Sequence, residues 1–465
     1  MSKNDSDLLF QMEGVPPLGT SISLALQHLV AMIVGCVTPA IIIANAAGLP
    51  QDMRVLLIQS SLVVSAISTL IQVYPIGGKK WPIRLGAGLP VILGISFAYL
   101  PSMQAIVEST GSIGAIAGAM IAGGIVAIIV GLMVDKIRKF FPTVITGTVV
   151  FTIGLSLYPT AVNYMAGGTA NTYELVVETK GLSEALVYGS WQNWLVAAIT
   201  LAAVMVLNNK GKGICKLASI LIGMAFGYIV AAFFGMVDFS DVSTASMFAV
   251  PEFMPFGIEF DFASCVAIGL LFAINSIQAI GDFTATTVGG MDRDPSNQEL
   301  KGGIVAYGLT NALSAFFGGL PTATYSQNVG IVTTNKVVNR TVFGLTGIFL
   351  LLAGVSPKFA AILTTIPQCV LGGATITVFS TIAMTGMKLI ASQKLDARNT
   401  TIVGLSAALG VGISQASSSL VQFPEEFIII FGKSPVVIAT VMAILLNLIL
   451  PREEKNKYLK LTGCF

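Results

Sequence analysis

Residues 318–330 read Gly-Gly-Leu-Pro-Thr-Ala-Thr-Tyr-Ser-Gln-Asn-Val-Gly, a run of helix breakers, hydroxyls and amides inside an apolar region. Residues 86–97 read Gly-Ala-Gly-Leu-Pro-Val-Ile-Leu-Gly-Ile-Ser-Phe and have a similar character. Glycine and proline destabilise the interior of a helix, so neither stretch favours a continuous one. We predict a broken segment at each of these two places.

The rest of the chain is strongly apolar. Of its 465 residues, 54% are hydrophobic and 10% are charged, whereas roughly a quarter of an ordinary soluble domain is charged. Most apolar runs approach the ~20 residues that cross a bilayer as a helix, and they recur from Thr20 almost to Leu450. This pattern predicts an all-α membrane protein with one membrane domain, residues 19–451, between polar tails at 1–18 and 452–465.

Short polar stretches divide the apolar region into about fourteen expected transmembrane segments. They begin near Thr20, Met53, Leu85, Ser112, Phe141, Asn193, Lys216, Phe262, Gly303, Thr322, Thr341, Lys358, Thr400 and Ser434. The two broken stretches are the third and the tenth of these segments.

Lys and Arg residues gather in alternate connections between the segments. Together with Lys3 and the C-terminal tail, these connections hold 21 of the 25 basic residues. The positive-inside rule then places both termini in the cytoplasm, as an even number of spans requires. Met1–Glu13 lacks a basic region followed by an apolar stretch, so we expect no cleaved signal peptide. The expected location is the plasma membrane, the inner membrane of a bacterium.

Two pairs of similar stretches in the sequence indicate an internal duplication. Phe-Pro-Thr-Val-Ile-Thr-Gly at residues 141–147 resembles Ile-Pro-Gln-Cys-Val-Leu-Gly at residues 366–372. Leu-Pro recurs at residues 89–90 and 320–321, where coincidence of a common dipeptide is the alternative. An odd number of spans separates the copies, so one half would be inverted relative to the other.

The expected repeats cover about residues 19–237 and 262–451, with seven segments each, and the broken segments occupy matching positions in them. Lipid tolerates irregular backbone only where protein shelters it or a cavity adjoins it. Broken segments in matching positions therefore indicate a binding site near the membrane midplane. Glycines that simply allow close helix packing are the alternative.

The eighth segment carries an acid among amides. Gln278 and Asp282 are four residues apart, and Asn275 precedes Gln278 by three, so all three share one helix face. Polar groups are costly within a membrane, and such a cluster is typical of a functional site, although Asp282 can alternatively be a buried hydrogen-bond anchor. For His28, the only histidine, a hydrogen bond between helices is favoured over proton transfer.

The tenth segment places Ser326, Gln327 and Asn328 in succession. A side-chain amide carries a donor and an acceptor side by side, which matches the adjacent N–H and C=O groups of a nucleobase edge. Phe97, at the end of the other broken stretch, can stack on the face of such a ring. These residues together favour a flat heterocycle with polar edges as the ligand.

The inventory of reactive side chains argues against an enzyme. The chain has one histidine and five scattered cysteines, without metal-ligand spacing or an evident pair of nucleophile and base. We therefore expect no metal site and no cofactor, and a small molecule and the lipid bilayer as partners, not nucleic acid. The paired broken segments favour a transporter with alternating access over a channel.

Several motifs resemble those of the nucleobase/ascorbate transporter family, also called nucleobase:cation symporters, over nearly the entire chain. The family signature is similar to residues 327–336, Gln-Asn-Val-Gly-Ile-Val-Thr-Thr-Asn-Lys. Residues 278–282, Gln-Ala-Ile-Gly-Asp, resemble a second family motif, Glu-x-x-Gly-Asp. Gln27-His28 and Ser96-Phe97 also match family positions.

The resemblance implies two inverted repeats of seven spans, a core domain that moves against a gate domain, short strands in the broken segments, and a homodimer. It further implies that Gln278 and Gln327 contact the base edge, that Phe97 contacts its face, and that Ser96, Ser326 and Asn328 lie nearby. Glutamine at position 327 resembles the purine branch, whose substrates include xanthine and urate. A uracil carrier, or a carrier of a small organic anion on the same scaffold, is the alternative.

This chain departs from the family pattern at three positions. Gln278 stands where a substrate-binding glutamate is usual, Asn335 replaces the signature threonine, and Tyr307 stands where relatives commonly have aspartate. Asp282 then remains the best candidate for coupling transport to H⁺ or Na⁺.

Overall fold

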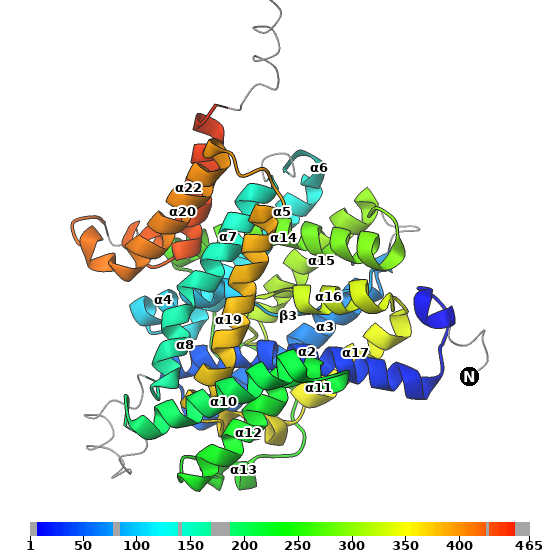
Figure 1. Ribbon diagram of the computed structural model, residues 1–465, viewed down its shortest axis with the longest axis vertical. Coiled ribbons are helices and arrows are strands. Elements are labelled where there is room, and N and C mark those ends of the chain that lie inside the picture. The colour runs from blue at the N-terminus through cyan, green and yellow to red at the C-terminus, as the bar shows by residue number, and fades with distance from the viewer. Residues whose placement is uncertain (1–6, 78–83, 138–141, 169–186, 425–426, 452–465) are drawn as a thin grey trace, which may run out of the picture.

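The computed structural model describes residues 7–77, 84–137, 142–168, 187–424 and 427–451, and this part of the chain is almost entirely helical (Figure 1). The elements of the N-terminal half are η1 (Leu8–Phe10), α2 (Leu18–Ala46), α3 (Gln51–Val73), β1 (Ile76–Gly77), β2 (Arg84–Leu85), β3 (Leu93–Ile95), η2 (Phe97–Tyr99), α4 (Leu100–Thr110), α5 (Ile113–Leu132), α6 (Val134–Ile137), α7 (Thr143–Ser156), α8 (Tyr158–Met165), α10 (Trp191–Lys210), α11 (Ile214–Leu217), α12 (Ser219–Phe233) and α13 (Ser240–Thr244).

The C-terminal half continues with a second set of elements. They are α14 (Phe262–Met291), α15 (Asn297–Ala315), β4 (Thr322–Thr324), α16 (Ser326–Asn335), α17 (Arg340–Gly354), α18 (Pro357–Thr364), α19 (Gln368–Ala391), α20 (Ala397–Gln415), η6 (Ser417–Leu420), the π-helix η7 (Ile428–Gly432) and α22 (Pro435–Ile449).

Seven helices in the described residues are long and apolar enough to cross a membrane, or eight if α17 and α18, bent by 77°, form one span. The seven are α2, α3, α5, α7 with α8, α10, α14 and α19. This confirms a multi-pass, all-α membrane protein, while the count of fourteen spans stays a prediction. The start expected for the twelfth segment, Lys358, is wrong: that residue lies in short helix α18, and α19 begins at Gln368 after Pro367.

Polar residues at the helix starts explain several boundaries. Asp261 accepts a hydrogen bond from the N–H of Ser264 at 2.7 Å at the start of α14. Ser296 and Glu299 form a reciprocal capping box at the start of α15. Such caps satisfy N–H groups that have no partner inside the helix, so each helix begins at a defined residue.

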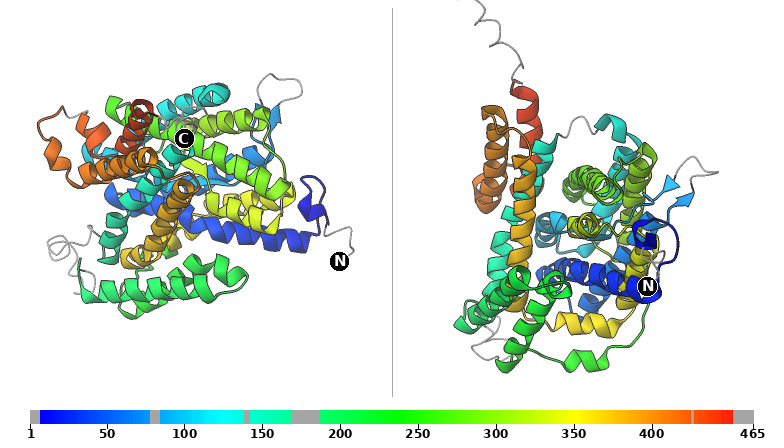
Figure 2. Two further views of the ribbon diagram at one scale, coloured as in Figure 1. Left: turned by 45° about the horizontal axis from the view of Figure 1, so that its top comes forward. Right: turned by 45° about the vertical axis from the view of Figure 1, so that its right-hand side comes forward.

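The helices form two groups that pack mainly within themselves. The first group contains α2 to α5 and α14 to α18 together with β3 and β4, and the second contains α7, α8, α10, α12, α19, α20 and α22. In Figure 2, the right-hand view shows the orange and red helices α19, α20 and α22 standing beside the blue and yellow helices of the first group. The groups meet where α14 contacts α7 and α22 and where α2 contacts α12, and we call this boundary the seam.

The same packing recurs in both halves of the sequence. Helix α5 packs on α14 and α15, and α17 packs on α2 and α3; likewise α10 pairs with α12, and α20 with α22. Small residues permit the closest contacts: a Cβ at Gly124 of α5 would come within 2.6 Å of the Gly308 carbonyl on α15. The recurrence supports the expected duplication.

Candidate functional site

Two short strands bring the broken segments together. β3 and β4 pair antiparallel, and the pairing continues beyond both ends. The N–H of Ser96 donates to the carbonyl of Pro321 at 3.0 Å, and the N–H of Tyr325 donates to that of Ile92 at 2.9 Å. The strands thus satisfy backbone groups that lipid could not. The short strands expected in both broken segments are confirmed.

Neighbouring helices of the first group fix each strand through one polar side chain. The Thr69 hydroxyl on α3 donates to the carbonyl of Leu93 at 3.1 Å and accepts from its N–H at 3.0 Å. The Asn311 amide oxygen on α15 accepts from the N–H of Thr322 at 2.7 Å. Equivalent helices of the two halves therefore hold equivalent strands.

Each strand leads directly into a helix start. The Ser96 hydroxyl accepts from the N–H of Ala98 at 3.2 Å where η2 begins. Helix α16 begins at Ser326, straight after β4 and Tyr325. Because the first N–H groups of a helix lack partners within it, both starts present donors and the positive end of a helix dipole.

A cavity of about 290 Å³ lies at these two helix starts. Five of the nine site residues predicted from the sequence line it: Ser96, Phe97, Gln278, Ser326 and Gln327. Three separate elements supply them, since Gln278 comes from the middle of α14. The structure therefore gathers two amides, two hydroxyls and an aromatic ring around one space.

The opposite wall of the cavity comes from the second helix group. It consists of Val150 and Ile153 on α7, and Thr381, Ile382 and Thr385 on α19. Sequence reasoning missed these residues because apolar and Thr side chains are ordinary in membrane helices. The only signal was a row of threonines at intervals of four, 377, 381 and 385.

Asp282 lies behind the cavity, one turn beyond Gln278, and is buried. Its carboxylate accepts from the hydroxyl of Thr324 at 2.5 Å and from that of Ser326 at 2.8 Å. In the described part of the chain, no Lys or Arg forms an ion pair with Asp282. The carboxylate thus ties α14 to the junction of β4 and α16 through neutral groups.

Asn328 and His28 form a second contact behind the cavity. The Asn328 amide nitrogen lies 3.1 Å from Nδ1 of His28 and donates to the His28 carbonyl at 3.1 Å. An amide NH₂ can only donate, so Nδ1 accepts and the neutral ring carries its proton on Nε2. Both side chains are buried. The pair connects the start of α16 to α2, which is the structural role favoured for His28.

Asn275 is not among the described residues that line the cavity. It is buried, and its amide nitrogen donates to the carbonyl of Leu271 at 2.9 Å. Nearby, the hydroxyls of Tyr99 and Tyr307 hydrogen-bond to each other, and Phe272 packs against both rings. Tyr307 therefore forms part of a buried aromatic cluster.

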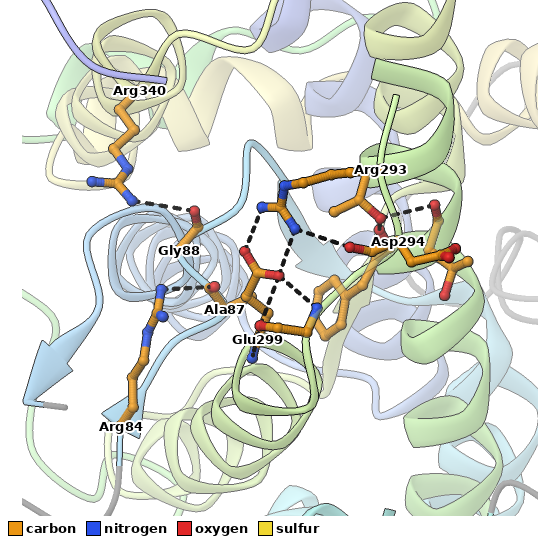
Figure 3. A network of polar contacts seen from close by, with 11 residues as sticks. Arg84, Ala87, Gly88, Arg293, Asp294, Glu299 and Arg340 are labelled. Carbon is orange, nitrogen blue, oxygen red and sulfur yellow. Dashed lines mark hydrogen bonds and ion pairs between the residues drawn. The ribbon is translucent and has the colours of Figure 1, made fainter. Parts of the chain in front are cut away.

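A network of charged residues holds the loop that precedes β3 (Figure 3). Arg84 donates to the carbonyl of Ala87 at 2.9 Å, and Arg340 of α17 donates to that of Gly88 at 3.4 Å. Arg293 pairs with Glu299 of α15 at 2.6 Å beside them. The loop that leads to the cavity is thus fixed from several elements.

The cavity opens toward the end of the molecule that carries the N-terminal segment. Gly281 and Ala285 follow Gln278 on the same face of α14 and are exposed, as is Gln327. Helix α16 leads from the cavity to Lys336, whose ammonium group pairs with an acid just beyond α14. At the opposite end, the buried side chains of Phe97 and Phe379 pack against each other across the seam.

Comparison with known proteins identifies the family. Residues 19–418 match the family described as "Permease family". The chain is 31% identical to the xanthine permease XanP of Escherichia coli strain K12 over 97% of this chain and 96% of that protein. It is 34% identical to the uric acid permease PucK of Bacillus subtilis strain 168 over 93% and 96%, respectively.

The fold is similar to that of two solved transporters. The transmembrane domain of the cyanobacterial bicarbonate transporter BicA matches with a TM-score of 0.58 and 17% identity, over 90% of this chain and 97% of that one. Murine Slc26a9, an anion transporter in the inward-facing state, matches with a TM-score of 0.61 and 9% identity, over 96% and 70%. At these identities the likeness concerns the fold. The sequence match over most of the chain decides the family: this protein belongs to the xanthine/uracil permease family and is a membrane transporter, not an enzyme.

Proposed function

We propose that the chain is a symporter for a purine nucleobase such as xanthine or urate. The observation that carries this proposal is the single cavity lined by Gln278, Gln327 and Phe97, which come from three elements. Two amides can pair with the donors and acceptors on a base edge, and the ring can cover its face. The names of the relatives, xanthine and uric acid permeases, support the same substrate class.

In this proposal the residues have separate roles. Gln278 and Gln327 read the edge of the base, and Phe97 stacks on its face. Ser96 and Ser326, with the N–H groups at the start of α16, complete the polar surroundings. Asn328 and His28 keep the start of α16 in place from behind, and Asn275 supports α14 below Gln278.

Asp282 is the proposed coupling group. A buried carboxylate that has hydroxyl partners and no basic partner among the described residues is stabilised when it binds a cation. Either H⁺ or Na⁺ would neutralise it. Because Ser326 both contacts Asp282 and lines the cavity, cation binding would change the polar groups that face the base.

The proposed architecture is a pair of inverted seven-segment repeats, about residues 19–237 and 262–451. The first helix group acts as the core that carries the base, and the second acts as the gate. The basic connections favour a cytoplasmic location for both termini, in a bacterial inner membrane. The cavity would then face the cytoplasm. We further propose a homodimer.

Uptake into proteoliposomes tests the function. Labelled xanthine or urate should accumulate in response to a pH or Na⁺ gradient and exchange with internal unlabelled base. Uptake of uracil alone, or of a small organic anion alone, would replace the purine assignment. Absence of counterflow with every purine and pyrimidine would end the proposal.

The Gln278→Glu variant tests the site. A carboxyl group at this position can bind a proton and repel an electron-rich edge, so we expect a changed base preference or a changed pH dependence of uptake. Gln393→Glu, in the exposed turn after α19, is the matched control and should transport like the parent. An unchanged profile for Gln278→Glu would remove this residue from the site.

A further inference from the structure

A second, larger cavity lies on the same seam between the helix groups. Its volume is about 610 Å³. The lining comes from α4 and α8 along their length, from the ends of α2, α7 and α20, and from residues near the starts of α19 and α22. In Figure 1, α4 and α8 lie at the side of the molecule opposite the N-terminal segment. The cavity is therefore an outer pocket, facing away from the mouth of the central one.

Amide side chains dominate the polar lining of the outer pocket. They are Asn45, Gln104, Asn163, Gln368 and Gln415, and Tyr164 adds an aromatic ring. The Gln368 amide oxygen is buried and has no hydrogen-bond partner in the described part of the protein. The outer pocket thus offers the same chemistry as the central cavity, amides with an aromatic ring.

The charged groups of the outer pocket balance each other. Glu108 of α4 pairs with Lys433, just before α22, at 3.8 Å. These are its only charged lining residues among those described. A lining without net charge favours a neutral polar molecule over an ion, since an ion would need an opposite charge or a full shell of donors.

About one helical turn of protein separates the two cavities. On α7, Ile153 lines the central cavity and Ser156 lines the outer one. On the other side of the seam, Phe97 lines the central cavity and Pro101 lines the outer pocket, and the buried Leu100 lies between them in the sequence. Phe97 meets Phe379 of α19 edge to face, with ring centroids 5.1 Å apart. These apolar side chains form a thin partition on the path between the pockets.

Polar contacts hold the seam closed beside the partition. Ser102 of α4 and Ser434 hydrogen-bond at 2.7 Å and are buried, and the ion pair of Glu108 and Lys433 lies further out. Both contacts join the first helix group to the second. A ligand in the outer pocket would sit directly against the contacts that must break for the seam to open.

We propose that the outer pocket is a second, weaker binding site for the same nucleobase, which holds the base before the seam opens. This rests on the proposed function, because the ligand is the one assigned to the central cavity. The amides of Gln104, Gln368 and Gln415 bind the edge of the base. Their positions on α4, α19 and α20 place the base between the two helix groups.

Equilibrium binding of labelled xanthine to the purified full-length chain in nanodiscs tests this inference. The parent should show a tight and a weak saturable phase. Gln278→Ala with Gln327→Ala should remove the tight phase and leave the weak one. Adding Gln104→Leu and Gln415→Leu should then remove the weak phase, whereas adding Gln393→Leu instead should leave it.

The outcomes separate the two proposals. If the parent binds no nucleobase at all, the proposed function fails. If the parent binds but the Gln278→Ala, Gln327→Ala chain has no saturable binding, or keeps it after Gln104→Leu and Gln415→Leu, only the outer site is wrong. A Tm close to that of the parent shows that each variant is folded.

Protection of an introduced cysteine from a thiol reagent provides an independent test, because it detects bound xanthine directly and does not rely on a variant that fails to bind. Ser417→Cys, at a position that lines the outer pocket but supplies none of the assigned amides, is combined with the central-site substitutions and with Cys215→Ser, which removes an exposed thiol. Xanthine should slow its reaction with a membrane-impermeant maleimide at concentrations that fill the weak phase. An unchanged rate at saturating xanthine would contradict the proposal.

Discussion

The two broken segments share a backbone design but differ in what they present. Each has a short strand and then a helix start, yet β3 leads to Ser96 and Phe97, and β4 leads to Ser326 and Gln327. The Ser96 hydroxyl accepts a hydrogen bond from the N–H of Ala98, two residues further along the same segment. The Ser326 hydroxyl instead donates to Asp282 on another helix. One segment offers an apolar face, and the other offers a polar edge linked to a buried acid.

This difference indicates a division of labour within a duplicated frame. The proposed base needs both a surface on which its ring stacks and side chains that hydrogen-bond to its polar edge. Each half can supply one of these two features. Among the described residues, the junction of β4 and α16 hydrogen-bonds to the buried carboxylate of Asp282, the proposed coupling group. Substitutions at matching positions should therefore have unlike effects on stability, coupling and binding.

Gly94→Ala should cause the greatest loss, because it affects the frame itself. A Cβ at Gly94 would lie 2.5 Å from Sγ of Cys36 and 2.8 Å from the Tyr325 ring. Overpacking of this kind costs about 1–3 kcal/mol and would displace β3 from β4. We expect a lower Tm and nearly complete loss of uptake.

The matched control is Gly404→Ala on α20, where a Cβ would meet nothing within 4 Å. It should retain uptake and lose no stability, since alanine favours a helix over glycine. Equal behaviour of the two variants would show that the strand pair does not limit function.

Asp282→Asn should abolish coupling but keep exchange. Asparagine retains an oxygen that can accept from Thr324 and Ser326, but it cannot bind a proton or contribute a negative charge. One proton per base can raise the accumulation of the base by up to about tenfold per unit of pH gradient. This uphill accumulation should vanish in the variant, whereas counterflow should persist. Accumulation equal to the parent's would exclude Asp282 as the coupling group.

Gln327→Ala should weaken binding without preventing folding, because this side chain is exposed in the cavity. Losing two hydrogen bonds to a base edge costs about 1–3 kcal/mol, or roughly 5- to 150-fold in Kd. Equilibrium binding of labelled base measures the change. Gln393→Ala is the control, and an unaltered Kd for Gln327→Ala would place the base elsewhere.

Ser96→Ala and Ser326→Ala compare the same substitution in both segments. Removing the Ser96 cap should lower stability by about 1 kcal/mol and leave the pH dependence of uptake unchanged. Removing the Ser326 hydroxyl takes a hydrogen bond from the Asp282 carboxylate, so the pH profile of uptake should shift. A shift of equal size in both variants would contradict the division of labour.

The sequence predicted the broken segments and five of the residues that line the cavity, mainly because their residue types conflict with lipid. Gln278, Gln327 and Ser326 are polar residues within apolar segments, and Gly and Pro residues precede both strands. The positions of Asp282 and His28 followed from helix spacing and from the scarcity of such groups.

The rest depended on packing that no local pattern reveals. Val150, Ile153 and Ile382 resemble any lipid-facing or core residue, and only the fold aligns them with Phe97. The start expected for the twelfth segment is too early because the apolar residues of α18 resemble the start of a span. The bend after Gly354 and the proline at position 367 instead separate α18 from the spanning helix. The outer pocket forms only where helices from both groups, among them α2, α4, α8 and α20, come together.

A structure of the full-length chain with saturating xanthine is the most direct test of the central claim, that the two interrupted segments meet around a nucleobase. We expect a flat ligand with its edge at the amides of Gln278 and Gln327 and its face on Phe97. A base bound away from all three residues, or an empty central cavity in a chain that transports xanthine, would contradict it.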